Sequence, residues 1–390
     1  MRLNPYTPYS GMFPTCFAGR EALINEEKNY FMGLRQNCSY KSVIFYGLCG
    51  VGKTVLLNYI RDLAEQNGVL SESIEPSENG GFKNQISLCA QKFIVRMSPI
   101  VEDQGFAAKA LVALKAFQSA YGASSNNLLS VKMNPKNETS DFENDLSELF
   151  IAMGTLARDT GSSICLFIDE IQHLKTDELG ALLTALFQVK QMCLPFMLIG
   201  TGLPQIKSIL GRICPYSESL FIFREISPLS DADAKLALME PAQNEGVSFS
   251  DGALEKILEI TGNYPYFIQE FASQAWKYIE NDTIGIKSVR SAIPDFEAAL
   301  DSGFFKVRFD KATNRQKLFM YAMLDCGGLP CTISRVAAHM HTEVQRIYPL
   351  RAQLTGKELI YSSQDGAIDF TVPHFEKFLQ RNVNLKPVLD

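Results

Sequence analysis

Hydrophobic and polar positions along this chain follow two different periods. After about residue 40, short continuous apolar runs alternate with longer stretches in which apolar residues recur every three to four positions. The short runs are typical of buried strands, and the longer period is typical of amphipathic helices. Strands that alternate with helices in this way predict a parallel α/β sheet. We expect strands at 42–46, 93–97, 164–168 and 196–200.

The helical pattern begins at Lys53 and ends near Asn67-Gly68, where the glycine favours a helix end. Between this helix and residue 200 the same periodicity predicts helices at 105–121, 142–157 and 176–190. The stretch from Gly122 to Asp141 is rich in Asn, Ser and Lys, and it indicates an exposed insertion.

The pattern changes twice in the second half of the chain. Past Phe221 the strand pattern fades, and a small all-helical unit is predicted, with helices at 230–240, 251–260 and 266–279. Its first helix opens with Ser230-x-x-Asp233, which is close to a capping box. From about residue 303 we expect helices at 312–324, 332–340 and 342–356, followed by a hairpin with an Asp365-Gly366 turn. Three helices followed by a hairpin predict a winged helix.

Composition narrows the class of protein. The 390 residues are 46% hydrophobic and 21% charged, which excludes a disordered chain. No run of 18 apolar residues and no leader-like N-terminus is present, so we expect a cytoplasmic protein with no membrane contact. The nine cysteines form no CxxC pair, which favours reduced core thiols over a disulfide or metal role. The net charge of −6 argues against a chain that binds nucleic acid over its whole surface.

Residues 47–54 carry the strongest chemical signal. They read Gly-Leu-Cys-Gly-Val-Gly-Lys-Thr, the pattern GxxxxGK[ST], with a predicted strand before it and a predicted helix after it. Glycines allow the backbone N–H groups to face phosphate oxygens, and the helix N-terminus adds a partial positive charge. Lys53 supplies a full charge for the β- and γ-phosphates, and the Thr54 hydroxyl is suited to ligate Mg²⁺. The predicted nucleotide-binding residues here are Gly47, Cys49, Gly50, Val51, Gly52, Lys53, Thr54 and Val55.

Two carboxylates follow the most apolar predicted strand. Open α/β sheets bind ligands at the carboxyl ends of their strands, so Asp169 and Glu170 should lie beside the phosphate-binding loop. We expect Asp169 to join Thr54 in the Mg²⁺ shell, and Glu170 to orient and polarise an attacking water. Thr201, after the next strand, is the candidate to hydrogen-bond the γ-phosphate or that water. The predicted catalytic set is therefore Lys53, Asp169, Glu170 and Thr201.

With these residues assembled, the chain resembles the AAA+ ATPases of the origin-recognition type. It is most similar to a group of bacterial ATP-binding proteins in which that module precedes a winged helix. Its matches to their motifs extend from about residue 13 to 380, and they include 17–21, 47–54, 166–170, 200–204, 223–229, 262–270 and 303–310. The resemblance implies ATP and Mg²⁺ as cofactors. It also implies a P-loop NTPase (AAA+) core with a parallel sheet over 1–225, a helical lid over 226–300 and a winged-helix domain over 301–390.

The resemblance also assigns residues outside the phosphate-binding loop. Phe17 and Arg20 match positions near the adenine, and Pro265 matches a lid position beside the nucleotide. Origin-recognition ATPases usually carry a sensor-2 arginine at the start of a lid helix, where this chain reads Gly262-Asn-Tyr-Pro265. A GxP sequence at that place is more similar to the signal-transduction (STAND) ATPases.

A second departure concerns the arginine finger. The family arginine is Ser219 in this chain, and the sequence leaves open whether Arg212 or Arg224 replaces it. An arginine finger accelerates hydrolysis by ~10³–10⁵-fold. Its absence therefore predicts a slow Mg²⁺-dependent ATPase that acts as a nucleotide-controlled switch.

The partner of the C-terminal region stays open at this stage. Residues 301–390 carry a net charge of +3, whereas residues 1–300 carry −9. The predicted recognition helix holds Arg346, Arg351 and Lys357, with Gln345 and Gln353 available for base edges. A basic group precedes the first helix of the winged helix: Lys306, Arg308, Lys311, Arg315 and Lys317. The two hypotheses are a winged helix that binds double-stranded DNA and a STAND-type signalling ATPase whose winged helix binds a protein partner or a second copy.

Overall fold

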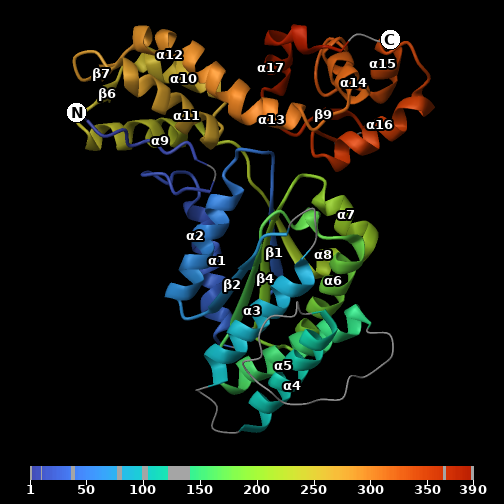
Figure 1. Ribbon diagram of the computed structural model, residues 1–390. Coiled ribbons are helices and arrows are strands. Elements are labelled where there is room, and N and C mark those ends of the chain that lie inside the picture. Colours follow the sequence, from blue (N-terminus) through green and yellow to red (C-terminus); the bar gives the residue numbers. More distant parts are fainter. Residues whose placement is uncertain are drawn as a thin grey trace. The chain divides into compact units, whose positions relative to one another are not determined.

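A computed structural model describes residues 2–9, 11–36, 40–76, 81–98, 104–121, 141–362 and 366–387 (Figure 1). The chain divides into two compact units. The first, here called the sheet unit, comprises residues 20–46 and 53–225. The second, here called the helical unit, comprises residues 1–19, 47–52 and 226–390.

The sheet unit is built on five parallel strands in the order β2-β3-β4-β1-β5 (Figure 1). The strands are β1 (Ser42–Tyr46), β2 (Leu70–Ile74), β3 (Ile164–Ile168), β4 (Phe196–Gly202) and β5 (Phe221–Glu225). In the central register, Ile168 of β3 lies beside Gly200 of β4, and Tyr46 of β1 lies beside Gly202. Because every pair is parallel, all five carboxyl ends meet at one edge of the sheet. This confirms the strands expected at 42–46, 164–168 and 196–200.

Helices cover both faces of this sheet. They are α1 (Glu21–Leu34), α2 (Lys53–Gln66), α3 (Phe82–Met97), α4 (Gln104–Tyr121), α5 (Phe142–Asp159), α6 (Thr176–Gln191), α7 (Ile206–Ile213) and α8 (Ser217–Leu220). One apolar core joins α3, α4, α5 and α6 to alternate side chains of the strands, Ile164, Leu166 and Ile168 among them. The central strand β3 is buried along its whole length, as its unbroken apolar sequence predicts. The exposed insertion expected after α4 lies outside the described residues except for Asp141.

The strand expected at 93–97 is wrong, because these residues form the last turns of α3. The five-residue window is apolar enough for a strand. However, buried residues recur at helical spacing from Phe82 through Ile86, Ala90, Phe93 and Met97. This longer periodicity outweighs the short β-like run.

The sequence pattern missed the two edge strands. Strand β2 reads Leu-Ser-Glu-Ser-Ile, and its polar residues hide the apolar alternation. Strand β5 continues to Glu225, so the strand pattern does not fade at Phe221 as expected. An edge strand is paired on one side only and is partly exposed, so its sequence needs fewer apolar residues than a central strand.

The helical unit contains a bundle of four helices: α9 (Asp231–Asn244), α10 (Asp251–Thr261), α11 (Pro265–Ala275) and α12 (Ile286–Ala299). Ser230 caps α9, since its side chain accepts a hydrogen bond from the Asp233 N–H, which confirms the expected cap. Two short strands, β6 (Ser248–Phe249) and β7 (Thr283–Ile284), pair beside the helices. The N-terminal segment packs on the bundle through Tyr6, which is buried and donates to the Leu238 carbonyl at 2.5 Å.

A winged helix follows in the same unit. Its three helices are α14 (Asn314–Leu324), α15 (Ile333–His339) and α16 (Val344–Gly356), and its hairpin pairs β8 (Ile360–Ser362) with β9 (Ile368–Phe370). This confirms the predicted three helices and hairpin, although Asp365 of the expected turn lies outside the described residues. The helix α17 (Phe375–Arg381) ends the domain. One apolar core runs through the bundle and the winged helix, and Phe305, Phe309, Phe375 and Phe378 meet within it.

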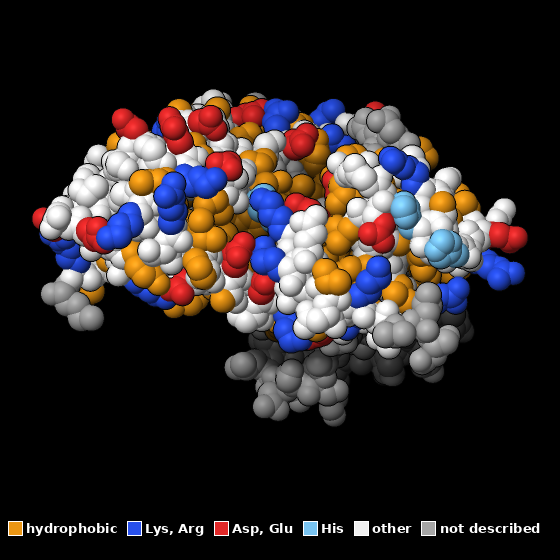
Figure 2. Space-filling view, turned by 90° about the horizontal axis from the view of Figure 1, so that it is seen from above, with side chains coloured by type: hydrophobic (Ala, Val, Ile, Leu, Met, Phe, Trp, Pro, Cys, Tyr) orange, Lys and Arg blue, Asp and Glu red, His pale blue; other side chains and the backbone are white. Residues whose placement is uncertain are grey.

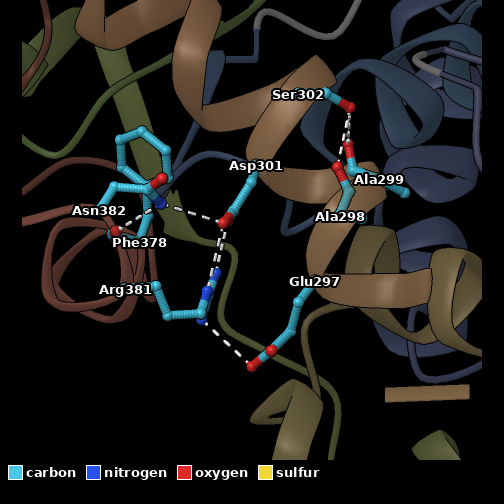
Figure 3. A network of polar contacts seen from close by, with 8 residues as sticks. All are labelled: Glu297, Ala298, Ala299, Asp301, Ser302, Phe378, Arg381 and Asn382. Atoms are coloured by element: carbon cyan, nitrogen blue, oxygen red, sulfur yellow. Dashed lines mark hydrogen bonds and ion pairs between the residues drawn. The ribbon is translucent and has the colours of Figure 1, made fainter. Parts of the chain in front are cut away.

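A polar network joins the bundle to the last helix (Figure 3). A π-helical segment, Leu300–Phe305, continues α12 and carries Asp301. Arg381 of α17 donates from Nε to Asp301 Oδ2 at 3.2 Å and from Nη2 to Oδ1, and it also reaches Glu297 of α12 at 3.2 Å. Asn382 donates to the same Asp301 carboxylate at 3.1 Å. Charge-assisted bonds of this kind therefore link two elements about 80 residues apart in sequence.

The described cysteines carry free thiols, and six of them are buried: Cys16, Cys89, Cys165, Cys214, Cys326 and Cys331. This agrees with the expectation of reduced core thiols for those six. Cys193 is exposed and Cys49 is half-buried, so the expectation does not extend to them. Burial raises the pKa of the Cys89 thiol to about 12, which makes it unreactive at neutral pH.

Candidate functional site

The carboxyl edge of the sheet brings together the residues that the sequence places in the catalytic set. Lys53 and Thr54 lie in the first turn of α2, Asp169 and Glu170 follow β3, and Thr201 lies near the end of β4. These elements converge because β3 and β4 are adjacent parallel strands, and α2 contacts both. The other three side chains, those of Lys53, Thr54 and Thr201, interact directly with Asp169 or Glu170.

Thr54 and Asp169 form an oxygen pair suited to a divalent cation. The Thr54 hydroxyl donates to Asp169 Oδ2 at 2.8 Å. Carboxylate and hydroxyl oxygens are the hard ligands that Mg²⁺ prefers, and Mg²⁺ usually takes its remaining ligands from water and phosphate. Within the described residues, no group of three or more His, Cys, Asp or Glu side chains is placed to hold a metal ion by itself. The donor set therefore fits Mg²⁺ bound together with a phosphate.

Lys53 is almost completely buried and faces Glu170. Its Nζ lies 3.6 Å from Glu170 Oε1, and 5% of the lysine side chain is exposed. A buried ammonium is costly unless an anion compensates it. Glu170 supplies part of that compensation, and a phosphate group would supply more.

Glu170 has a strained backbone. Its φ of 46° and ψ of 55° lie in the left-handed region, which costs a non-glycine residue about 1–3 kcal/mol. Two acceptors hold the Glu170 N–H in this conformation: Thr201 Oγ1 at 2.9 Å and Asp169 Oδ1 at 3.1 Å. Backbone strain of this kind concentrates at functional sites, which supports a functional role for Glu170.

Thr201 is buried, and its hydroxyl joins the two acidic residues. It accepts the Glu170 N–H and donates to Asp169 Oδ1. In the expected role it would instead bond the γ-phosphate or the water. The contacts made here hold the Asp169 carboxylate and the Glu170 backbone in place, which is a role that the sequence pattern did not indicate.

Gln172 is a member of this site that sequence reasoning missed. It lies in the 3₁₀ turn Ile171–His173 after β3, and its Nε2 donates to Glu170 Oε2 at 2.6 Å. The available signal was a Gln two residues after an Asp-Glu pair at a strand end. A single polar side chain in a turn is common, so this signal is weak without the geometry.

The phosphate-binding loop, residues 47–52, belongs to the helical unit. Gly50 and Gly52 have φ values of +82° and +90°, which L side chains rarely adopt, so glycine is required for the curl of the loop. A Cβ on Gly47 would lie 2.3 Å from the Ile226 carbonyl oxygen, so that position is also confined to glycine. Val51 is buried.

Two hydrogen bonds connect this loop to other parts of the helical unit. The Tyr266 N–H, in the first turn of α11, donates to the Gly50 carbonyl at 3.2 Å. The Cys49 N–H donates to the Thr371 carbonyl, after β9, at 3.4 Å. Pro265 is the first residue of α11, where its fixed φ suits a helix start. The loop, the Gly262–Pro265 segment and the winged helix therefore share one unit.

The remaining predicted residues lie at element ends. Arg20 precedes α1 as its N-cap residue, and Val55 lies in the first turn of α2. Phe17 belongs to the N-terminal segment and packs against Phe13, with ring centroids 5.8 Å apart.

The two arginines that the sequence considered for the finger role differ in their surroundings. Arg224 on β5 forms a two-pronged ion pair with Glu26 of α1, to which Tyr30 also donates at 2.6 Å. The Arg224 guanidinium holds the pKa of the Glu26 carboxyl below its ordinary value. Arg212 is exposed near the end of α7, where its Nε donates to the Ser208 carbonyl of the same helix.

The comparisons with known proteins identify the N-terminal part of the chain. Residues 17–199 match the family described as AAA ATPase domain, and residues 302–379 match a domain of unknown function (DUF8462). None of the curated proteins matches the sequence. Among the described helices, none is long and apolar enough to cross a membrane.

Solved structures resemble the fold at low sequence identity. A Walker-type ATPase of Pyrococcus abyssi is 14% identical, with 93% of this chain and 96% of that chain covered and a TM-score of 0.55. Cdc6p from Pyrobaculum aerophilum is 15% identical over 97% of each chain, with a TM-score of 0.47. The Aeropyrum pernix Orc1 protein in complex with DNA is 15% identical over 95% and 94%, with a TM-score of 0.46. The family match and the phosphate-binding motif within it show that residues 17–199 of this chain contain an AAA ATPase domain.

Proposed function

We propose that this protein is an ATP-controlled switch that binds ATP with Mg²⁺ and hydrolyses it slowly. The observation that carries the proposal is the connected set of side chains at the carboxyl edge of the sheet. Lys53 faces Glu170, Thr54 faces Asp169, and Thr201 joins the Asp169 carboxylate to the Glu170 backbone N–H. This is the arrangement that a P-loop ATPase needs to bind phosphates and to activate water.

Each side chain has a distinct role in the proposed reaction. Lys53 binds phosphate oxygens, and Thr54 with Asp169 holds the cation. When bound, Mg²⁺ neutralises charge on the phosphate oxygens. Glu170 accepts a proton from the water that attacks the γ-phosphate, and its exposed fraction of 28% leaves room for that water. Thr201 holds the Asp169 carboxylate and the Glu170 backbone in register.

The slow rate follows from the arginines. Ser219 occupies the position at which the resemblance places the arginine finger, and Arg224 forms an ion pair with Glu26. Of the two candidate arginines, Arg212 is the exposed one, so it is the one that could reach the site of a second copy of the chain. Without such a copy, we expect hydrolysis without the ~10³–10⁵-fold contribution of a finger. A nucleotide state that persists for long periods suits a switch.

The contacts of the winged helix favour a protein partner over DNA. Arg351 donates to Ser362 Oγ at 2.6 Å, Lys357 donates to the Lys311 carbonyl at 2.6 Å, and Gln353 accepts from Gln316 at 2.8 Å. Three of the five side chains expected to contact DNA are thus used within the domain. Base readout requires side chains that are free to reach a groove.

Part of the basic group at residues 306–317 also has partners within the helical unit. Lys306 and Lys317 both pair with Asp310, and Arg308 lies over the Phe304 ring. Figure 2 shows Lys and Arg side chains interspersed with Asp and Glu, without one continuous basic patch on the face in view. The exposed Arg346 and Gln345 of α16 are what support the DNA-binding alternative.

The test of the proposed ATPase uses two substitutions with opposite expected effects. Lys53→Ala should abolish ATP binding, because the phosphates lose their buried cation. Glu170→Gln should keep ATP binding but trap unhydrolysed ATP, because the amide cannot accept the water's proton. ATP binding is measured by titration calorimetry, and hydrolysis by single-turnover assays with and without Mg²⁺.

The control is Lys287→Ala, an exposed lysine in the helical unit that pairs only with exposed Glu280. The assignment of Glu170 is wrong if Glu170→Gln hydrolyses ATP at the wild-type rate. The switch proposal is wrong if the wild-type protein hydrolyses ATP rapidly and Arg212→Ala leaves that rate intact.

A further inference from the structure

The side-chain amide of Gln172 makes two hydrogen bonds. Its nitrogen bonds Glu170, and its oxygen bonds the residue that follows strand β4. Its Nε2 donates to Glu170 Oε2 at 2.6 Å. Its Oε1 accepts the Leu203 N–H, directly after β4, at 3.4 Å. A Cβ on Gly202 would lie 3.1 Å from this same Oε1, so the small residue before Leu203 leaves space for the amide. The orientation of the amide is therefore fixed from both sides.

This contact completes the set of interactions that orient Glu170. Its N–H is held by Thr201 and Asp169, and its Oε1 lies 3.6 Å from Lys53 Nζ. Oε2 is bonded to Gln172. A glutamate side chain that is 28% exposed would otherwise sample several rotamers, and fixing such a chain costs conformational entropy. Gln172 offsets part of that cost before any substrate binds.

We propose that Gln172 is a positioning residue for hydrolysis, which holds the Glu170 carboxylate so that Oε1 faces the phosphate side of the site. The proposal rests on the proposed function of Glu170 as the base. The amide suits this role because it donates a hydrogen bond without adding a charge. A lysine or arginine at the same place would form an ion pair with the carboxylate and make it a weaker proton acceptor.

The hydrogen bond between Gln172 and Leu203 also ties Glu170 to strand β4. Leu203 directly follows β4, the strand that carries Thr201, so Gln172 and Thr201 tie Glu170 to the same strand at two points. Thr201 holds the Glu170 backbone, and Gln172 holds its carboxylate. A shift at the end of β4 would therefore move the base as a whole.

Two substitutions test the proposal. Gln172→Ala should lower kcat by ~10–100-fold with KM and ATP affinity within about twofold of wild type, because general-base catalysis depends on a positioned group. Gln172→Glu places a second carboxylate beside Glu170. It keeps the length of the side chain but removes the donor amide, so it should lower kcat at least as far as Gln172→Ala while ATP affinity stays within about twofold of wild type. A purely structural residue would instead lower the thermal stability and leave kcat of the folded protein unchanged.

The matched control is Gln191→Glu, which adds the same charge at the exposed last residue of α6. It should leave both kcat and KM unchanged. Thermal unfolding and ATP titration of each variant identify any loss of folding, and Gln172→Asn gives a shortened amide if Gln172→Ala does not fold. Wild-type kcat in folded Gln172→Ala and Gln172→Glu would overturn the proposal. Failure of the proposed function is distinguishable, because the wild-type protein itself would then bind ATP without hydrolysing it.

Discussion

At the scale of single residues, Glu27 has an environment unlike that of the other acids on α1. It is buried, and one of its carboxyl oxygens has no hydrogen-bond partner. Burial, and after it the neighbouring Glu26, raise its pKa, Arg224 opposes both, and the resulting pKa is about 8. The residue is therefore protonated in the folded protein at neutral pH, whereas it is ionised in the unfolded chain.

This difference predicts how stability depends on pH. Below the ordinary glutamate pKa of 4.5 both states are protonated, and Glu27 costs nothing by titration. Between pH 4.5 and about 8 the unfolded chain binds fewer protons than the folded one, so stability falls as pH rises. Glu27→Gln removes this loss, and it should raise the free energy of unfolding by about 2–4 kcal/mol at pH 8 and by little at pH 4.5.

Urea unfolding at the two pH values checks this expectation. Glu148→Gln, at an exposed position of α5, is the matched control and should shift stability by less than about 0.5 kcal/mol at both. An equal effect of Glu27→Gln at pH 4.5 and pH 8 would contradict the protonation argument.

At the scale of elements, the network of Figure 3 predicts how firmly α17 is held against the bundle. Arg381 makes two-pronged contact with Asp301, and the two side chains are 29% and 23% exposed. Partly buried, two-pronged pairs are worth more than surface pairs. Arg381→Ala should lower the free energy of unfolding by about 1–3 kcal/mol, because Asp301 keeps its burial and loses its main cation.

Arg381→Lys separates charge from geometry. Lysine keeps the charge but lacks the planar fork, so we expect a loss between those of wild type and Arg381→Ala. A double-mutant cycle with Asp301→Asn, followed by urea unfolding, measures the coupling. A coupling energy near zero would show that the network contributes only packing. Lys287→Ala, which breaks an exposed pair, is the control and should change stability little.

The sequence predicted the buried strands and the helices of the winged helix because their patterns are long or unbroken. Residues 164–168 are five apolar residues in succession, and so short an unbroken apolar run is typical of a buried strand and too short for a helix. Residues 93–97 were assigned wrongly, since a five-residue window is too short to reveal that the same positions belong to a 16-residue helix. The edge strands were missed because solvent on one side permits serine and glutamate within them.

The candidate site was predictable only in part, because some of its residues belong to short sequence motifs and others depend on contacts that the fold creates. Lys53, Thr54, Asp169 and Glu170 belong to short motifs whose chemistry can be recognised without coordinates. Gln172 depends on a contact across to the residue after β4, and the use of the Thr201 hydroxyl depends on strand register. Such contacts are properties of the fold, which no local sequence pattern contains.

At the scale of the whole chain, the distribution of charge predicts how strongly the protein binds DNA. Residues 301–390 carry only +3, and most cations expected at the interface are engaged inside the winged helix. Duplex binding should therefore be weak and independent of sequence, and it should be lost by about 0.2 M salt. Its affinity should not change between ATP and ADP.

A fluorescence titration with a short duplex, at 0.05 and 0.2 M salt in each nucleotide state, measures this. Arg346→Ala should remove most of the residual low-salt binding, whereas Lys287→Ala should not. Tight binding that changes between ATP and ADP would contradict the protein-partner proposal and favour a DNA-binding winged helix.

The backbone of Glu170 has a consequence for how this protein could be made more robust. A residue held in the left-handed region lowers the stability of the fold, and glycine or asparagine at that position would relieve the conformational cost. Laboratory evolution that rewards heat resistance alone should therefore tend to discard this glutamate. Evolution under a joint demand for heat resistance and turnover should retain it and place its improvements elsewhere in the chain.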